Sequence, residues 1–198
     1  MKEVIFVILE GFADWEGAYI ATYLNQGVKP GNPISYKVKT LSITQEPVSS
    51  IGGFRVLPDY GLKDMAEDYA GLVLIGGMNW FSPEAELIVP LVEKAIKEKK
   101  LVAGICNASV FLGMHGFLNE VKHTSNTLNY LKQYAGDKYT GDSNYINEQA
   151  VRDENIVTAN GTGQLEFCKE ILYALEADTA DAIEESYLFY KNGFCPGA

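Results

Sequence analysis

The sequence predicts an α/β protein, a three-layer α/β/α sandwich in which a mostly parallel sheet lies between two layers of helices. Three apolar runs without regular polar alternation, at residues 2–9, 69–77 and 101–105, are typical of strands buried on both faces. Helix-patterned stretches separate these runs, and such alternation favours parallel pairing. The 198 residues, 47% of them hydrophobic, are enough to bury one core, so we expect a single domain over residues 1–198.

The first strand and helix are expected within residues 2–27. Residues 2–9 are nearly all apolar and predict a strand inside the sheet. Asp14 is a candidate N-cap for the following helix, and Gly27 stands where that helix would end. Residues 36–43 alternate between polar and apolar side chains, which predicts the second strand.

The next segment combines turn signals with a third strand. Residues 48–57 predict a hairpin whose two-residue turn is the glycine pair at 52–53. A short helical stretch is expected near Met65, before the buried strand at residues 69–77. The Ser-Pro pair at 82–83 predicts the start of a helix, with serine as the N-cap and proline in the first turn.

The most informative stretch is the strand at residues 101–105, which runs directly into a helix-patterned segment at Cys106. Gly104 and Ala108 are small, as the tight strand-to-helix turn of a nucleophile elbow requires. The Cys106 thiol would then lie at a helix N-terminus, where the helix dipole and free N–H groups lower a thiol pKa. The alternative is a buried cysteine that only fills space.

The elements after the elbow complete the alternating pattern. They are a short strand at 121–124, a short helix at 127–134, a strand at 155–159, an apolar-striped helix at 164–177 and a final helix at 180–190.

Candidate site residues follow from this topology, because ligands bind at the carboxyl ends of parallel strands. Loops at residues 11–16, 76–79, 106–107 and 160–163 are expected to meet there. The pair Gly76 and Gly77 lets bare backbone approach a substrate. One of their N–H groups and that of Asn107 would form an oxyanion hole. Paired glycines are also simply a tight strand exit.

Other candidates are the residues that would assist the thiol. A Glu16 carboxyl beside Cys106 would orient it, although an acidic residue in a first helical turn is also ordinary. His123 could serve as the base, or be a surface strand residue, whereas His115 is expected to face away. Trp15 and Trp80 fall in loops at this end, where they would line a pocket, form a subunit contact or cap the core.

Composition narrows the function classes. The net charge of −10 and the pI near 4.7 disfavour a nucleic-acid partner, which needs clustered Lys and Arg. The apolar run at residues 2–9 is too short to span a membrane. Cys106, Cys168 and Cys195 have no metal-type spacing, so we expect no metal and no cofactor, and an odd number of thiols indicates a reducing, cytoplasmic location.

Four segments resemble the ThiJ/PfpI superfamily, which includes deglycases and intracellular proteases and has a flavodoxin-like, class I glutamine amidotransferase-like fold. The resemblance covers nearly the whole chain. It rests on Gly-Phe-Ala-Asp-Trp-Glu at 11–16, Leu-Ile-Gly-Gly at 74–77, Ala-Gly-Ile-Cys-Asn-Ala at 103–108 and Gly-Thr-Gly-Gln at 161–164.

The resemblance implies roles for individual residues. Cys106 would be the reactive cysteine and Glu16 its partner, a pair in which the thiol is acidic and readily oxidised to sulfinic acid. Asn126 stands at the usual histidine position, and an amide cannot shuttle a proton. The C-terminal His-x-Glu of the amidotransferases is replaced by the Gly-Thr-Gly loop at 161–163, so standard glutamine hydrolysis is not expected. The pocket would include Trp15, Asn126 and Thr162.

Three hypotheses for function therefore stand. The first is a cysteine-dependent hydrolase, glyoxalase or deglycase acting on small carbonyl or amide compounds. The second is a redox or stress-response protein whose Cys106 is oxidised without turnover. The third is a non-catalytic binding module that keeps the pocket. In each case the resemblance implies a homodimer and a small-molecule substrate or ligand.

Overall fold

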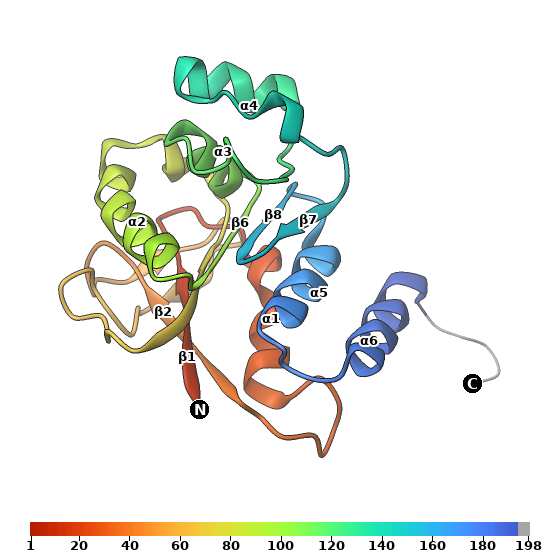
Figure 1. Ribbon diagram of the computed structural model, residues 1–198. Helices are drawn as coiled ribbons and strands as arrows, with labels where there is room; N and C mark the ends of the chain where they lie inside the picture. Colours follow the sequence, from red (N-terminus) through yellow and green to blue (C-terminus); the bar gives the residue numbers. More distant parts are fainter. Residues whose placement is uncertain (194–198) are drawn as a thin grey trace.

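The computed structural model describes residues 1–193 and is built around a six-stranded sheet of order β2-β1-β5-β6-β8-β7 (Figure 1). All neighbouring strands are parallel except β7, which runs antiparallel to β8 at the edge. The strands are β1 (Lys2–Val7), β2 (Tyr36–Leu41), β5 (Tyr69–Leu74), β6 (Leu101–Ile105), β7 (Ala150–Asp153) and β8 (Ile156–Ala159). The predicted mostly parallel α/β architecture is confirmed.

Helices cover both faces of this sheet (Figure 1). They are α1 (Asp14–Gln26), α2 (Val89–Lys97), α3 (Asn107–Met114), α4 (Leu128–Ala135), α5 (Gln164–Ala174) and α6 (Ala180–Asn192). Successive β1 side chains alternate between two cores: Val4 and Phe6 pack on the side of α1, α5 and α6, and Ile5 and Val7 on the side of α2 and α3. Burial on both faces is the reason that these strands are continuous apolar runs.

Two expectations near the N-terminus are corrected. Asp14 is the first residue of α1, and Ala13 is the N-cap. The Asp14 carboxylate instead accepts the Gly52 N–H at 2.8 Å, which ties the hairpin to α1. The hairpin itself is present, as β3 (Val48–Ser49) and β4 (Arg55–Val56), but its turn is longer than two residues. The Ser50 N–H bonds the Phe54 carbonyl at 2.8 Å, which leaves three residues between them.

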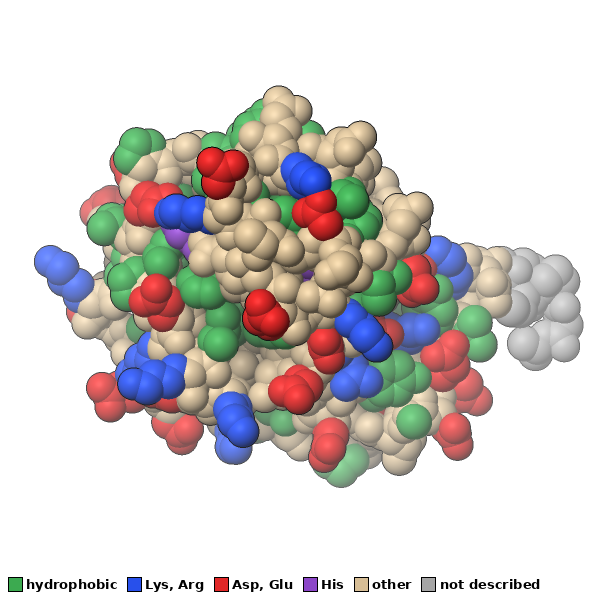
Figure 2. Space-filling view, turned by 45° about the horizontal axis from the view of Figure 1, so that its top comes forward, with side chains coloured by type: hydrophobic (Ala, Val, Ile, Leu, Met, Phe, Trp, Pro, Cys, Tyr) green, Lys and Arg blue, Asp and Glu red, His purple; other side chains and the backbone are tan. Residues whose placement is uncertain are grey.

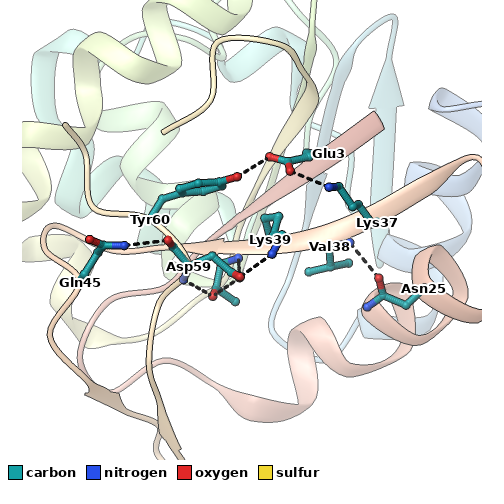
Figure 3. Close-up of polar contacts among 9 residues, drawn as sticks. Glu3, Asn25, Lys37, Val38, Lys39, Gln45, Asp59 and Tyr60 are labelled. Atoms are coloured by element: carbon teal, nitrogen blue, oxygen red, sulfur yellow. Dashed lines mark hydrogen bonds and ion pairs between the residues drawn. The ribbon is translucent and has the colours of Figure 1, made fainter. Parts of the chain in front are cut away.

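The helical stretch expected near Met65 is absent, and the chain forms turns there. Residues 58–62 instead run along the edge strand β2, where Tyr60 pairs with Thr40 and Ser42 through backbone hydrogen bonds. Side chains hold this segment in place (Figure 3): Asp59 accepts from the Lys39 ammonium at 2.7 Å, and the Tyr60 hydroxyl donates to Glu3 at 2.9 Å. Pairing with an otherwise open sheet edge outweighs the local helical pattern.

The remaining corrections concern short elements. Residues 83–88 form a 3₁₀ helix, so the α-helix expected from residue 82 begins only at Val89. Residues 121–124 are not a strand and form a single bridge, between His123 and Tyr145. The antiparallel strand β7 was not predicted. The elements expected at 127–134, 155–159, 164–177 and 180–190 are present with slightly different ends.

Figure 2 views the molecule with α4 turned toward the reader. Acidic and basic side chains are mixed with apolar ones over this face. No helix within residues 1–193 is long and apolar enough to cross a membrane.

Candidate active site around Cys106

Cys106 lies in the sharp turn between β6 and α3. Its backbone has φ 56° and ψ −126°, a conformation that non-glycine residues rarely adopt and that strand-to-helix elbows impose. A Cβ on Gly104 would lie 2.8 Å from the Leu112 side chain, which explains the small residue before the cysteine. The Cys106 N–H donates to the Ala159 carbonyl at 2.9 Å, so β8 holds the turn in place. The thiol is partly exposed.

Glu16 reaches this turn from the first turn of α1. Its side chain is buried, with 2% of the residue exposed, and its Oε2 accepts the Gly76 N–H at 2.8 Å. A Cβ on Gly76 would stand 2.3 Å from that oxygen and 2.7 Å from the Cys106 Cβ. Only glycine therefore allows the carboxyl and the cysteine to approach each other, and Glu16 is not an ordinary exposed acidic residue.

The two ionisable groups change each other's protonation. Burial raises the pKa of Glu16 to about 7. Burial, followed by the charge of Glu16, raises the pKa of the Cys106 thiol to about 11, although hydrogen bonds from Asn126 and the Asn107 N–H oppose this. The expected lowering of the thiol pKa is thus wrong, because burial and a neighbouring carboxylate outweigh the helix N-terminus. Between about pH 7 and pH 11, Glu16 and Cys106 together hold one proton. A thiolate forms when this proton moves from the sulfur to the Glu16 carboxylate.

The structure shows which glycine of the pair is available for the expected oxyanion hole. Gly76 is not a donor, because Glu16 occupies its N–H. Its carbonyl accepts the Ala13 N–H at 2.9 Å, and in a trans peptide this directs the Gly77 N–H to the opposite side. Asn107 is the first residue of α3, so its N–H has no partner within the helix. Gly77 and Asn107 therefore remain as the candidate N–H donors for an oxyanion.

His123 does not assist Cys106. Its Nδ1 donates to the Val121 carbonyl at 2.7 Å, and its Nε2 then accepts the Tyr139 hydroxyl at 2.7 Å. Burial lowers its pKa, so the ring is neutral and both nitrogens are engaged. The expectation that His123 replaces the catalytic base is wrong, because the ring is part of the core. His115 ends α3 and faces Glu86 at 3.3 Å, away from the elbow as expected.

The side chains expected to line the pocket have different surroundings. Asn126 contacts the thiol, with Nδ2 3.6 Å from Sγ. Thr162 is exposed, and its hydroxyl hydrogen-bonds Asn160 in the same loop and Gln149 just before β7. Trp15 is 47% exposed on the first turn of α1, whereas Trp80 is buried and donates its indole N–H to the Ile75 carbonyl at 2.6 Å. Trp80 is therefore a core residue.

Sequence reasoning missed two supports of the elbow. The Ser109 hydroxyl bonds the Cys106 carbonyl at 2.6 Å and shares a hydrogen bond with the Ser125 hydroxyl at 2.8 Å. Gly161 carries its own constraint, since a Cβ there would lie 3.1 Å from the Cys106 sulfur. The Gly-Thr-Gly loop was a visible signal for the second, but nothing in the local pattern identifies the serine pair. Within residues 1–193, no cluster of three or more His, Cys, Asp or Glu side chains could hold a metal ion.

Comparison with known proteins assigns the family. A sequence model of the DJ-1/PfpI family matches residues 2–174. The chain belongs to the DJ-1/PfpI family. It is 38% identical over 195 residues to the Bacillus subtilis protein named uncharacterized protease YdeA. The aligned part covers 98% of this chain and 93% of YdeA.

Two further DJ-1/PfpI relatives extend the comparison. The Caenorhabditis elegans protein named glutathione-independent glyoxalase DJR-1.2 is 30% identical over 135 residues, 66% of this chain and 69% of that protein. The crystal structure of a thiJ/pfpI family protein from Bacillus anthracis superposes with a TM-score of 0.88 at 34% identity, and covers 96% of this chain and 90% of the other.

The shared proton predicts an unusual pH dependence of Cys106 alkylation by iodoacetamide. In the wild type the rate should rise in two steps, near pH 7 and near pH 11. In Glu16→Gln a single step should remain, below pH 11, because the carboxylate that raises the thiol pKa is gone. Mass spectrometry of the Cys106 peptide measures both profiles. A one-step profile shared by both proteins would contradict the coupling.

The buried carboxyl also costs stability at neutral pH. Well below pH 4.5 the Glu16 carboxyl is protonated in both the folded and the unfolded protein. Between pH 4.5 and about 7 it ionises freely only in the unfolded protein, so the loss of folding stability grows through that pH window. Above it, the cost is roughly 3 kcal/mol. Glu16→Gln should therefore be more stable than the wild type by this order at pH 8, and nearly equal to it at pH 4.5. Urea unfolding at both pH values measures this, and a pH-independent difference would contradict it.

Proposed function

We propose that this DJ-1/PfpI protein is a cysteine-dependent enzyme that acts on small carbonyl compounds. The observation that supports this most is the buried Glu16 carboxyl beside Cys106, with a pKa raised to about 7. A carboxyl with that pKa can accept a proton and return it near neutral pH, as a general acid–base group must. The glyoxalase name of the Caenorhabditis elegans relative is consistent with this chemistry.

The first step is addition of the thiol to an aldehyde. Glu16 takes the proton from Sγ, the sulfur forms a bond to the carbonyl carbon, and the C=O π electrons move to oxygen. The Gly77 and Asn107 N–H groups would stabilise the developing oxyanion. Glu16 then returns the proton to this oxygen, which gives a hemithioacetal with no net gain or loss of atoms.

A 2-oxoaldehyde allows the reaction to continue with a single acid–base group. Glu16 removes the proton from the carbon that carries sulfur and returns it to the neighbouring carbonyl carbon, and the hydroxyl proton moves to that carbonyl's oxygen. The product is a thioester of a 2-hydroxy acid, which water hydrolyses to release the acid and the thiol. Peptide cleavage instead requires a proton for the leaving amine, usually from histidine, and both ring nitrogens of His123 are already hydrogen-bonded, to Val121 and Tyr139.

Turnover of methylglyoxal to lactate tests this proposal. Cys106→Ser and Glu16→Gln should each lower kcat/KM by at least about 100-fold, since one removes the nucleophile and the other its proton acceptor. Cys168→Ala is the matched control, because Cys168 is buried in α5 and does not contact the site. Its kcat/KM should stay within about two-fold of wild type. Unchanged turnover in Cys106→Ser would reject the proposal.

If methylglyoxal is not turned over, the reactivity of Cys106 distinguishes the two other hypotheses. Oxidation of Cys106 to sulfinic acid by mild peroxide, ahead of Cys168, would support the redox function. Cys168 is buried and burial raises its pKa, which protects it. Cys195 lies outside the described residues. A Cys106 inert to both peroxide and iodoacetamide would support the binding module. The free thiols of Cys106 and Cys168 are consistent with a cytoplasmic location, which we also propose.

We further propose that the protein forms a homodimer, as the family resemblance implies. The β3–β4 hairpin and the adjoining start of α1 expose large apolar side chains, namely Ile51, Phe54, Leu57 and Trp15, with 47 to 69% of each residue accessible. They lie beside an apolar groove of about 190 Å³ between α1 and β2. Exposed apolar surface of this kind is typical of protein interfaces.

Light scattering coupled to size exclusion tests the dimer. The wild type should have twice the mass of one chain, and the double variant Phe54→Ser/Leu57→Ser should have the mass of one, because it loses apolar contact area. Leu87→Ser is the control, since Leu87 is exposed to a similar degree outside the hairpin. A monomeric wild type at micromolar concentration would contradict the proposal.

A further inference from the structure

The Asn126 amide faces the Cys106 sulfur from the segment between α3 and α4. Its Nδ2 lies 3.6 Å from Sγ and 3.3 Å from the Oδ1 of Asn107. We propose that Asn126 is a catalytic residue that donates a hydrogen bond to the Cys106 thiolate and is held in that orientation by a chain of amide hydrogen bonds. This inference rests on the assignment of Cys106 as the nucleophile.

The backbone determines which atom of Asn126 faces the sulfur. The Gly161 N–H bonds the Asn126 Oδ1 at 2.9 Å, and a backbone N–H can only donate, so the oxygen must face Gly161. The nitrogen is therefore directed to Cys106. Asn107 is oriented in the same manner, because its Nδ2 donates to the Gly77 carbonyl at 3.2 Å, and its Oδ1 is left to accept from Asn126.

The amides thus form one directional chain, from the Gly161 N–H through Asn126 and Asn107 to the Gly77 carbonyl. Reversing either side chain would set a donor against a donor or an acceptor against an acceptor. This chain of hydrogen bonds links the loop after β8 to the loop after β5, and the elbow lies between the two loops. Gly161 lets the first loop come this close, since a side chain there would meet the sulfur.

The donor matters because burial and the neighbouring ionisable groups both oppose a thiolate at Cys106. Among residues 1–193, the ionisable groups that act on it are the Glu16 carboxyl from α1 and the Tyr130 hydroxyl from α4, and neither is a cation. The Asn126 amide and the Asn107 N–H act in the opposite direction. An amide does not titrate, so this donor is present at every pH. Asn126 therefore stabilises the thiolate while Glu16 alone moves the proton.

Alkylation of Cys106 by iodoacetamide tests the role without requiring any substrate. Asn126→Ala should slow the reaction at pH 8 by about 10-fold and move the midpoint of its pH profile to higher pH, because a hydrogen bond to a charged sulfur is lost. Asn126→Asp should slow it further. A carboxylate still accepts the Gly161 N–H, so the loop is retained, but it cannot donate and adds a negative charge.

The matched control is Asn160→Asp, which adds the same charge to the adjacent loop. The Asn160 Oδ1 accepts the Thr162 N–H at 2.9 Å, an interaction that aspartate keeps, and its side chain bonds neither Cys106 nor Asn126. Its alkylation rate should stay within about two-fold of wild type. Near-UV circular dichroism verifies folding of all variants.

Three outcomes decide the inference. Wild-type alkylation profiles in folded Asn126→Ala and Asn126→Asp would overturn it, as would an equal shift in Asn160→Asp. A displaced profile in the Asn126 variants alone would support it even if methylglyoxal were not turned over, in which case only the proposed reaction would fail.

Discussion

The site depends on one close approach, that of the buried Glu16 carboxyl to Cys106. This approach brings an acidic side chain out of water, which raises its pKa to about 7 and destabilises the fold at neutral pH. Gly76 makes it possible, because its N–H binds the carboxylate and any side chain there would overlap both partners. The strained backbone at Cys106 belongs to the same arrangement, since it lies in the turn that places the cysteine beside Gly76 and Glu16. The buried carboxyl lowers the stability of the fold, and the same burial gives it a pKa at which it can accept and release a proton near neutral pH.

The sheet brings these groups together from distant parts of the chain. Glu16 follows β1, Gly76 and Gly77 follow β5, Cys106 follows β6 and Gly161 follows β8, and these four strands are neighbours with a common direction. Their carboxyl ends therefore lie together at the same end of the sheet (Figure 1). In the reaction that we propose, each of these four segments supplies one group: the proton acceptor, an oxyanion donor, the nucleophile and the anchor for the Asn126 amide. A DJ-1/PfpI chain that lacks a histidine beside the cysteine can in this way still surround the sulfur with polar groups.

Where sequence reasoning failed, a tertiary contact outweighed a local pattern. His123 was expected either to serve as the base or to lie on a surface strand, yet the ring is enclosed and hydrogen-bonded to Val121 and Tyr139. The helix expected near Met65 is absent because residues 58–62 pair with the sheet edge. Asp14 caps no helix because its carboxylate holds the hairpin at Gly52. None of these partners is near its residue in sequence, apart from Val121.

The sequence by itself determined the layered α/β fold, the elbow at Cys106 and the set of loops that would surround it. Those features follow from hydrophobic period and from the residue sizes that a tight turn permits, which are local properties. Only the tertiary structure decided the electrostatics. The Cys106 pKa rises because the thiol itself is buried and, second, because the Glu16 carboxyl lies beside it, and Asn126 donates to the sulfur because the Gly161 N–H fixes its orientation. Burial and hydrogen-bond direction arise between segments that are far apart in the chain, so no local pattern records them.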